Sequence, residues 1–367
     1  MILGSLGFLG LYIHIPFCVK KCNYCDFNSF DNLNELKQPY TNALIKEIND
    51  SVYNDVIDSV FIGGGTPTSL DISMLIDIIN AVKSNFTLQN AEFTVEVNPA
   101  TLDKAGFIML KNAGVNRISF GLQSANDDEL LTLGRIHTYI DFEKSYNLAV
   151  ECGFDNINVD LMFSLPSQNL EKWSYTLEKV VGLSPQHISC YSLIVEENTP
   201  FYEMDFDHPT EDIDREIYDY TIKFLSENGY KHYEISNFAK ENKECQHNIK
   251  YWRRGQYIGF GAGAHSLYND VRFENEENIE EYIRNNCITK TSLTKEEIIS
   301  EYIFLGLRMT NGISLKEFYN LFGIDFTTEY ADIISKYTAL NLMKIDDRCY
   351  LTIDGLNVSN KIMAEFL

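Results

Sequence analysis

The stretch Tyr12–Cys25 reads YIHIPFCVKKCNYC, an apolar run followed at once by three closely spaced cysteines. The segment Leu11–Ile15 predicts a buried strand, and Cys18, Cys22 and Cys25 form a C-x3-C-x2-C pattern directly after it. Three thiolates on one short loop can hold three corners of a cubane iron–sulfur cluster and leave its fourth iron free. The alternatives are a zinc site or chance. Zinc usually takes four protein ligands, and the sequence has no second C-x2-C pair.

Outward from this stretch, strand-like and helix-like segments alternate to about residue 236. Apolar runs predict the strands, and amphipathic segments between them predict helices. The predicted strands are Leu11–Ile15, Ser59–Ile62, Glu92–Val97, Arg117–Leu122, Asn156–Phe163 and His187–Leu193, with a seventh at His232–Ser236. Such repeated alternation is typical of an α/β protein with a parallel sheet. Periodicity alone does not distinguish a doubly wound sheet from a TIM-type barrel.

Polar and glycine-rich groups stand at the carboxyl ends of these predicted strands. Besides the cysteines they are Gly64, Gly65, Thr66, Glu96, Gln123 and Asp160. Functional groups collect at this edge in both kinds of parallel fold. Glycines also let a backbone approach a ligand closely, and free N–H groups can bind a carboxylate. We therefore expect a ligand site at this edge.

Beyond about Gly255 the pattern changes, and we predict three segments: 1–240, 241–294 and 295–367. The middle segment holds a glycine-rich loop and the acidic run 273–281, which predicts a linker or a solvated helix. The last segment predicts three helices and a hairpin, as in a small winged-helix-like α+β domain. These elements are Glu296–Met309, Leu315–Phe322, Thr328–Thr338, and Leu342–Ile345 paired with Cys349–Ile353.

The charge balance excludes nucleic acid as a partner. The 367 residues carry 30 Lys and Arg against 53 Asp and Glu, a net charge of −23. Neutralising phosphates requires clustered cationic side chains, so the winged-helix-like segment is better suited to a structural or partner-docking role. No stretch of about 18 uncharged apolar residues predicts a membrane span. Residues 1–17 lack the basic start and cleavage site of an export signal, so we expect a cytoplasmic protein with reduced cysteines.

The cysteine spacing resembles the signature of the radical S-adenosylmethionine (SAM) superfamily. The resemblance implies a [4Fe–4S] cluster on Cys18, Cys22 and Cys25, whose open iron chelates the amino and carboxylate groups of SAM. Reduction would then cleave SAM to a 5′-deoxyadenosyl radical. It also implies a partial TIM-type (β/α)6 barrel, and places Tyr12 beside SAM and Tyr24 near its adenine.

Further SAM contacts follow from the same resemblance, in motifs at the strand ends. The residues are Gly64, Gly65, Thr66, Glu96, Gln123, Arg135 and Asp160. The glycine run would take the SAM carboxylate, and Glu96 would take the amino group or a ribose hydroxyl. An isolated Arg or Asp is usually a solvated surface group, so only position and motif support Arg135 and Asp160.

The motifs from Tyr12 to the C-terminus are similar to those of the coproporphyrinogen oxidase-like branch of the superfamily. The oxidases carry a fourth cysteine, in C-x3-C-x2-C-x-C, and this place is Phe27 here. They also have a longer arm before the cluster, whereas seventeen residues precede Cys18. Residues 247–252 read HNIKYW, which resembles the H-N-x-x-Y-W motif of haem chaperones of the HemW family.

The resemblance to this family implies binding of haem and its delivery to haem-requiring apoproteins, such as respiratory enzymes. The alternative is an oxygen-independent coproporphyrinogen III oxidase that decarboxylates its substrate to protoporphyrinogen IX. Whether the scaffold acts as an enzyme stays open, and no residue is assigned a catalytic role. His247 is the candidate haem ligand, with a hydrogen-bonded structural histidine as the alternative. A homodimer is a further expectation.

Overall fold

Six parallel strands form the centre of a twelve-stranded sheet in the computed structural model, which describes residues 8–204 and 209–367. The sheet order is β12-β11-β10-β9-β1-β2-β3-β4-β5-β6-β8-β7. The six central strands are β1 (Phe8–Ile15), β2 (Val56–Gly64), β3 (Thr87–Val97), β4 (Arg117–Gln123), β5 (Ile157–Phe163) and β6 (His187–Ser192). They match the strands predicted from the apolar runs.

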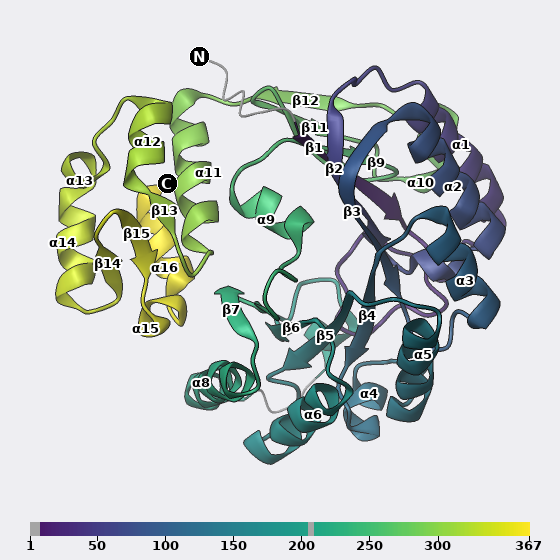
Figure 1. The fold of residues 1–367 in the computed structure, drawn as a ribbon, viewed down its shortest axis with the longest axis horizontal. Helices are drawn as coiled ribbons and strands as arrows, with labels where there is room; N and C mark the ends of the chain where they lie inside the picture. Colours follow the sequence, from purple (N-terminus) through teal and green to yellow (C-terminus); the bar gives the residue numbers. More distant parts are fainter. Residues whose placement is uncertain (1–7, 205–208) are drawn as a thin grey trace.

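Helices between these strands cover the outer face of the sheet, which curves into an open arc (Figure 1). They are α1 (Lys37–Asn49), α2 (Ile72–Asn85), α3 (Lys104–Ala113), α4 (Asp127–Thr132), α5 (Tyr139–Glu151), α6 (Leu170–Leu183) and α8 (Glu211–Glu227), with short helices η1 (Asn34–Leu36), η2 (Pro67–Ser69) and α7 (Pro200–Glu203). In β1, Leu11, Ile13 and Ile15 are fully buried in the core, while Tyr12 points to the opposite face because side chains alternate along a strand. The partial (β/α)6 barrel is thus confirmed.

Shorter strands extend the sheet at both edges. They are β7 (Lys231–Glu234), β8 (Asn237–Ala239), β9 (Tyr257–Phe260), β10 (His265–Tyr268), β11 (Val271–Glu274) and β12 (Thr289–Ser292), accompanied by α9 (Gln246–Trp252) and α10 (Ile279–Asn285). α9 lies inside the arc (Figure 1). The acidic run 273–281, expected as a linker or solvated helix, instead contains the end of β11 and the start of α10. The β10–β11 hairpin turns at Asn269 and Asp270, both with positive φ, a two-residue turn that suits right-twisted strands.

The C-terminal unit has the strand order β13-β15-β14 and the helix–strand alternation of a winged helix, as predicted. Its elements are α11 (Lys295–Leu307), β13 (Ile313–Ser314), α12 (Leu315–Phe322), α13 (Phe326–Glu329), α14 (Ala331–Ala339), β14 (Met343–Ile345), β15 (Arg348–Leu351), α15 (Ile353–Leu356), α16 (Ser359–Met363) and η3 (Ala364–Phe366). The predicted third helix is two helices that meet at Tyr330. The two-residue β13 is too short to produce a pattern in the sequence.

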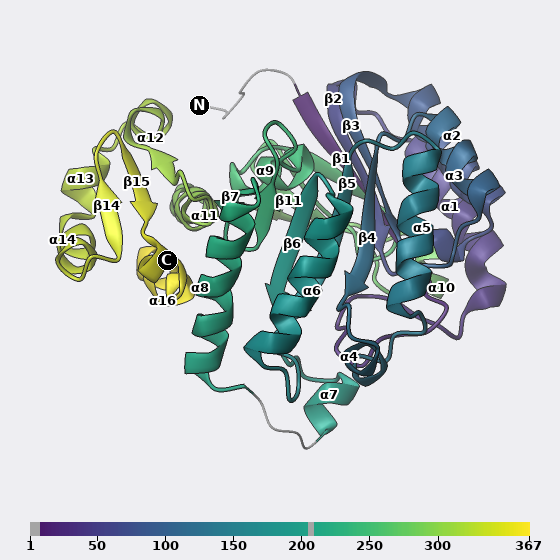
Figure 2. The ribbon, with the colours of Figure 1, turned by 60° about the horizontal axis from the view of Figure 1, so that its bottom comes forward.

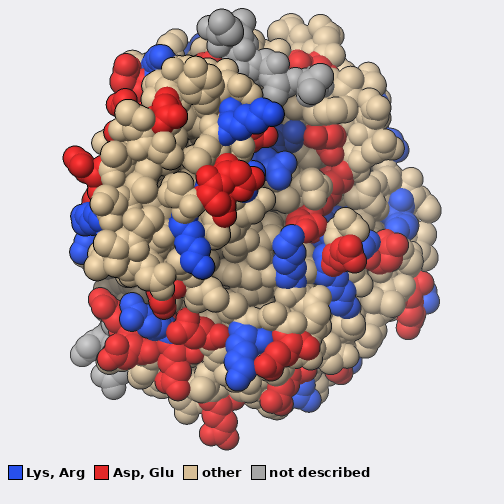
Figure 3. Space-filling view, turned by 60° about the vertical axis from the view of Figure 1, so that its left-hand side comes forward, with Lys and Arg blue, Asp and Glu red and all other residues tan. Residues whose placement is uncertain are grey.

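This unit lies on the open side of the arc, beside α8 and β7 (Figure 2). Backbone hydrogen bonds join it to the sheet edge, from Ile235 N to Arg308 O and from Thr310 N to Tyr233 O, both 3.1 Å. Acidic side chains, with some Lys and Arg among them, gather across the lower part of the face shown in Figure 3. Across the described part of the chain, no helix is long and apolar enough to cross a membrane.

Candidate cluster and SAM site

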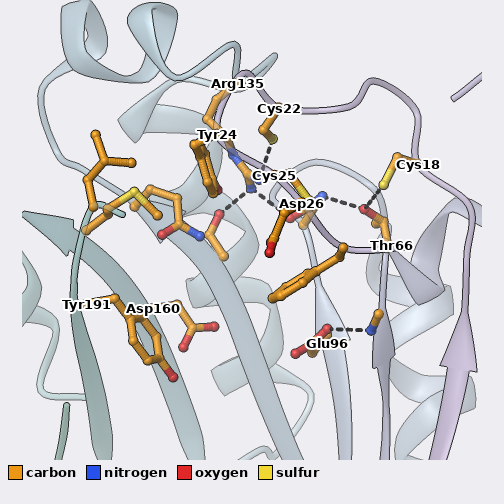
Figure 4. A pocket seen from close by; sticks show the side chains of 18 of the residues that line it. Cys18, Cys22, Tyr24, Cys25, Asp26, Thr66, Glu96, Arg135, Asp160 and Tyr191 are labelled. Carbon is orange, nitrogen blue, oxygen red and sulfur yellow. Dashed lines mark hydrogen bonds between the residues drawn. The ribbon is translucent and has the colours of Figure 1, made fainter. Parts of the chain in front are cut away.

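A cavity of about 380 Å³ opens at the carboxyl ends of the parallel strands, under the cysteine-bearing loop that follows β1. Most of the residues predicted to bind the cluster or SAM line it. They are Cys18, Cys22, Cys25, Tyr24, Gly64, Gly65, Thr66, Glu96, Gln123, Arg135 and Asp160. In Figure 4 the cysteines lie at the top of the cavity and the carboxylates of Glu96 and Asp160 lie below them. The fold therefore joins residues from five strand ends into one site.

Each cysteine sulfur has a hydrogen-bonding neighbour. The pairs are Thr66 Oγ1 to Cys18 Sγ at 3.7 Å, Arg135 Nη1 to Cys22 Sγ at 3.4 Å, and Ser29 Oγ with Cys25 Sγ at 3.8 Å. Burial raises the pKa of the Cys18 and Cys25 thiols, and hydrogen bonds from the hydroxyls oppose this effect. Thiolates in such a place need a bound cation, which the irons of a cluster supply. The three sulfurs and their donors fit a [4Fe–4S] cluster, which would supply an electron when reduced.

The glycines after β2 hold the cysteine loop in place. A Cβ on Gly65 would lie 2.8 Å from Phe17 O and 3.1 Å from Cys18 Sγ, so no larger residue fits beneath the loop. The N–H groups of Gly65 and Thr66 donate to Ile15 O (2.9 Å) and Phe17 O (2.8 Å). These two N–H groups are therefore not free to bind a carboxylate. The glycine pattern had predicted that they would be free, so this expectation is wrong for Gly65 and Thr66. Their role in this structure is to anchor the loop that carries Cys18.

Two carboxylates form the floor of the cavity. Burial, and then the negative charge of Asp160, raise the pKa of Glu96 to about 8, while a hydrogen bond from Gly64 N (3.2 Å) opposes the rise. Asp160 accepts hydrogen bonds from Ser119 Oγ (3.0 Å) and Asn158 Nδ2 (2.9 Å). A half-buried pair of acidic groups favours a cationic ligand. The ammonium and sulfonium groups of SAM fit this floor.

Arg135 connects the cysteine loop to the sheet. Its Nη2 donates to Asn98 Oδ1 (2.7 Å) and Gly121 O (2.5 Å), and its Nη1 reaches Cys22. Gln123 holds a left-handed backbone conformation (φ +76°) at the end of β4, and its buried Oε1 has no partner. Backbone strain of this kind collects at ligand sites. Both residues come from segments more than 95 positions away from the cysteines, and only the fold brings them there.

The structure does not bring Tyr12 and His247 into this cavity. The Tyr12 hydroxyl is hydrogen-bonded to His14 Nδ1 at 2.9 Å. His247, in α9, is 1% exposed; its Nδ1 contacts Ser59 Oγ at 3.1 Å and its Nε2 contacts the Tyr251 hydroxyl at 2.7 Å. Both ring nitrogens are thus engaged, and burial lowers the pKa of His247 to about 3. This geometry is that of a hydrogen-bonded structural histidine, and a role in haem binding stays a prediction.

Two residues of the site were assigned no role from the sequence, although Asn98 belongs to a polar motif at the end of a predicted strand. Asn98 donates from Nδ2 to Thr66 Oγ1 (2.7 Å) and accepts from Arg135, so it links the two groups that contact cysteine sulfurs. Tyr191 lines the cavity from β6. Each follows or ends a predicted strand on the same edge as the other site residues. That position was the available signal.

The partial parallel barrel, with a C-x3-C-x2-C loop over an acidic pocket at its carboxyl edge, defines a radical SAM protein. The family model described as the radical SAM superfamily matches residues 12–180, and the one described as the HemN C-terminal domain matches residues 293–352.

Similarity to named relatives extends over nearly the whole chain. It is 38% identical to "Heme chaperone HemW" of Bacillus subtilis (strain 168), covering 97% of this chain and 98% of the relative. The protein of the same name from Lactococcus lactis is 34% identical, covering 97% and 96%. The chain therefore belongs to the HemW family. Its fold is similar to that of the coproporphyrinogen III oxidase HemN from Escherichia coli (TM-score 0.87, 24% identity, covering 98% and 90%).

Proposed function

We propose that this protein is a haem chaperone, which binds haem and passes it to haem-requiring apoproteins such as respiratory enzymes. The observation that carries the proposal is its membership of the HemW family over essentially its full length. A second observation supports it. Phe27 occupies the place of the fourth cysteine of the oxidases and lies at the rim of the cluster cavity with 63% of its surface exposed.

In this proposal Cys18, Cys22 and Cys25 ligate the cluster, and Arg135 and Thr66 donate hydrogen bonds to its sulfur ligands. Such bonds tune the reduction potential of an iron–sulfur cluster. Glu96, Gln123 and Asp160, with Tyr24, bind SAM, and Gly64 and Gly65 form part of the wall against which it lies. The cluster with SAM serves regulation or assembly, including dimerisation, more than turnover.

We infer further that the protein works in the reducing cytoplasm, because all eight of its cysteines are unpaired. Neither ring nitrogen of His247 is free, so its ligation of haem iron would require the bond to Tyr251 to break. Replacement of His247 by Ala tests this role directly. A Soret band unchanged in that variant removes His247 as the ligand.

The second candidate function is the oxidase, favoured by the completeness of the cluster and SAM cavity. One anaerobically reconstituted preparation tests both functions. Haem titration should give a Soret band with saturable binding, and incubation with SAM, a reductant and coproporphyrinogen III should give no protoporphyrinogen IX. Formation of that product in catalytic amounts contradicts the chaperone proposal, as does the absence of haem binding.

A further inference from the structure

A second cavity, of about 440 Å³, lies where α9 meets the C-terminal unit. It shares no lining residue with the cluster cavity. Its walls come from the end of α9 (Trp252 to Arg254), from α11 (Tyr302), from α12 (Asn320) and from β15 (Arg348). Its volume falls in the range of about 300–1,000 Å³ found for small-molecule sites.

The walls of this cavity combine flat apolar surface with positive charge. Trp252 and Tyr302 are aromatic, and Arg253, Arg254 and Arg348 carry guanidinium groups, whereas Glu317 is the single carboxylate of the lining. Arg254 is already paired with Asp270 and Glu301, which leaves Arg253 and Arg348 against Glu317 in the lining, a local excess of positive charge in a chain with 53 acidic and 30 basic residues. Guanidinium groups recognise carboxylates, and aromatic rings stack on flat ligands. The lining therefore suits a flat, largely apolar ligand that bears carboxylates.

Two donors in residues that line the cavity have no protein acceptor. Arg254 donates from Nε to Glu301 (2.9 Å) and from Nη1 to Asp270 (2.8 Å), but its Nη2 has no partner although the side chain is only 3% exposed. The indole Nε1 of Trp252 is likewise buried and unpaired, and the Arg308 guanidinium lies 4.4 Å from the ring centroid. Buried donors without acceptors are rare in proteins. Both atoms are closed to solvent in this structure, so a ligand carboxylate would reach them only after neighbouring side chains move.

The position of Trp252 connects this cavity with the H-N-x-x-Y-W motif. Trp252 is the last residue of the motif and lines the cavity, while the histidine of the motif is closed off inside the barrel. The cluster cavity is lined by the residues proposed to hold the cluster and SAM, which would occupy it when bound. A haem chaperone of this fold therefore needs a separate place for its cargo.

Two other cavities are less suited to such a ligand. One, of about 480 Å³, lies beside α1 and α10, and its lining carries equal numbers of cationic side chains (Lys46 and Arg284) and acidic ones (Glu47 and Asp50). Another of about 520 Å³ beside α8 and α16 also has its cationic side chains matched by acidic ones, and no aromatic side chain lines it. The cavity beside α1 and α10 also has aromatic walls, including Tyr53 and Phe273, so the cavity at α9 differs from it in charge and differs from the cavity beside α8 in both charge and aromatic lining.

We propose that the cavity between α9 and the C-terminal unit is where this protein holds the ring and carboxylates of a tetrapyrrole. This inference rests on the proposed haem-binding function and assigns that function a place. Trp252 and Tyr302 flank the ring, and Arg253 at the exposed rim pairs with a carboxylate. The C-terminal unit is then one wall of the cargo site.

The first test of this placement is steric: a large side chain is introduced into the cavity by substitution at an exposed position. Asn320→Trp places a large ring into the cavity from an exposed position of α12, and Tyr319→Trp adds the same ring at the adjacent exposed position, which does not line the cavity. Full-length proteins are titrated with haem and followed by the Soret band. We expect the dissociation constant to rise at least roughly tenfold for Asn320→Trp, as when a central contact of a site is lost, and to stay unchanged for Tyr319→Trp.

The chemical test uses haem and haem dimethyl ester, which lacks free carboxylates. Arg253→Gln should weaken haem binding roughly tenfold, in line with the loss of one charge-assisted hydrogen bond, and should leave ester binding unchanged. Arg284→Gln, at the rim of the cavity beside α10, is the matched control and should bind both probes as the wild type does. If wild-type protein binds haem and both Asn320→Trp and Arg253→Gln bind it equally well, the placement is overturned and the chaperone function stands. If wild-type protein gives no Soret band, the chaperone function itself is overturned.

Discussion

Glu96 should make SAM binding strongly dependent on pH. Its carboxyl group has a pKa of about 8 because it is buried beside Asp160, so at pH 7 roughly nine-tenths of it is protonated before SAM binds. The cationic groups of SAM favour the carboxylate form, so binding near neutral pH should release close to one proton. SAM affinity should therefore rise about tenfold per pH unit up to pH 8 and then level off. Binding at pH 7 should be weaker than at pH 9 by about 1.4 kcal/mol, one pKa unit.

Isothermal titration calorimetry of the anaerobically reconstituted protein from pH 6 to 9 measures this dependence, and buffers of different ionisation enthalpy count the protons released. In Glu96→Gln the slope contributed by this carboxyl disappears, and affinity at pH 9 falls because a neutral amide replaces the carboxylate. Asp160→Asn removes the charge that helps to raise the pKa of Glu96, so the plateau should begin at lower pH. An equal pH slope in wild type and Glu96→Gln would refute the reasoning.

Three further predictions concern stability and the cluster. Gly64→Ala should destabilise the protein by about 3 kcal/mol or more in thermal unfolding, because φ is +109° and the new Cβ would lie 2.5 Å from the ring of His14. The control Gly323→Ala should lose only about 1 kcal/mol, because φ is +68° but no atom lies within 4 Å of the new Cβ. Equal losses in the two variants would contradict the steric argument. Thr66→Val removes the hydroxyl that donates to Cys18 Sγ and should lower the reduction potential of the cluster in a spectroscopic redox titration, whereas an unchanged potential would show that this bond does not tune it. The raised pKa of Glu96 means that the folded protein binds an extra proton between pH 4.5 and about 8, so the stability of the ligand-free protein should fall as pH rises through this window. Denaturant unfolding of Glu96→Gln should lack this fall, and a parallel fall in both proteins would assign it to other groups.

Local patterns in the sequence were sufficient for the central part of the fold. A buried parallel strand must be apolar on both sides, so β1 to β6 stand out as apolar runs between amphipathic helices. The cysteine loop is equally local, because three thiolates within eight residues form a site before any long-range contact is made. The strands at the sheet edges were harder to predict. β11 contains charged residues on its half-exposed faces, and its acidic surroundings hid a hairpin whose turn at Asn269 and Asp270 was the available signal.

The amino-acid sequence thus determines the cysteine spacing, the order of strands and helices, and the polar character of each strand end, since all of these depend on neighbours along the chain. Tertiary structure decides what depends on distant neighbours. Only the folded chain places Arg135 beside Cys22 and raises the pKa of Glu96 through burial and the charge of Asp160. It also engages both ring nitrogens of His247 in hydrogen bonds, with Ser59 and Tyr251. Solvation and electrostatic interactions are set by what surrounds a group in space, and sequence separation carries no information about that.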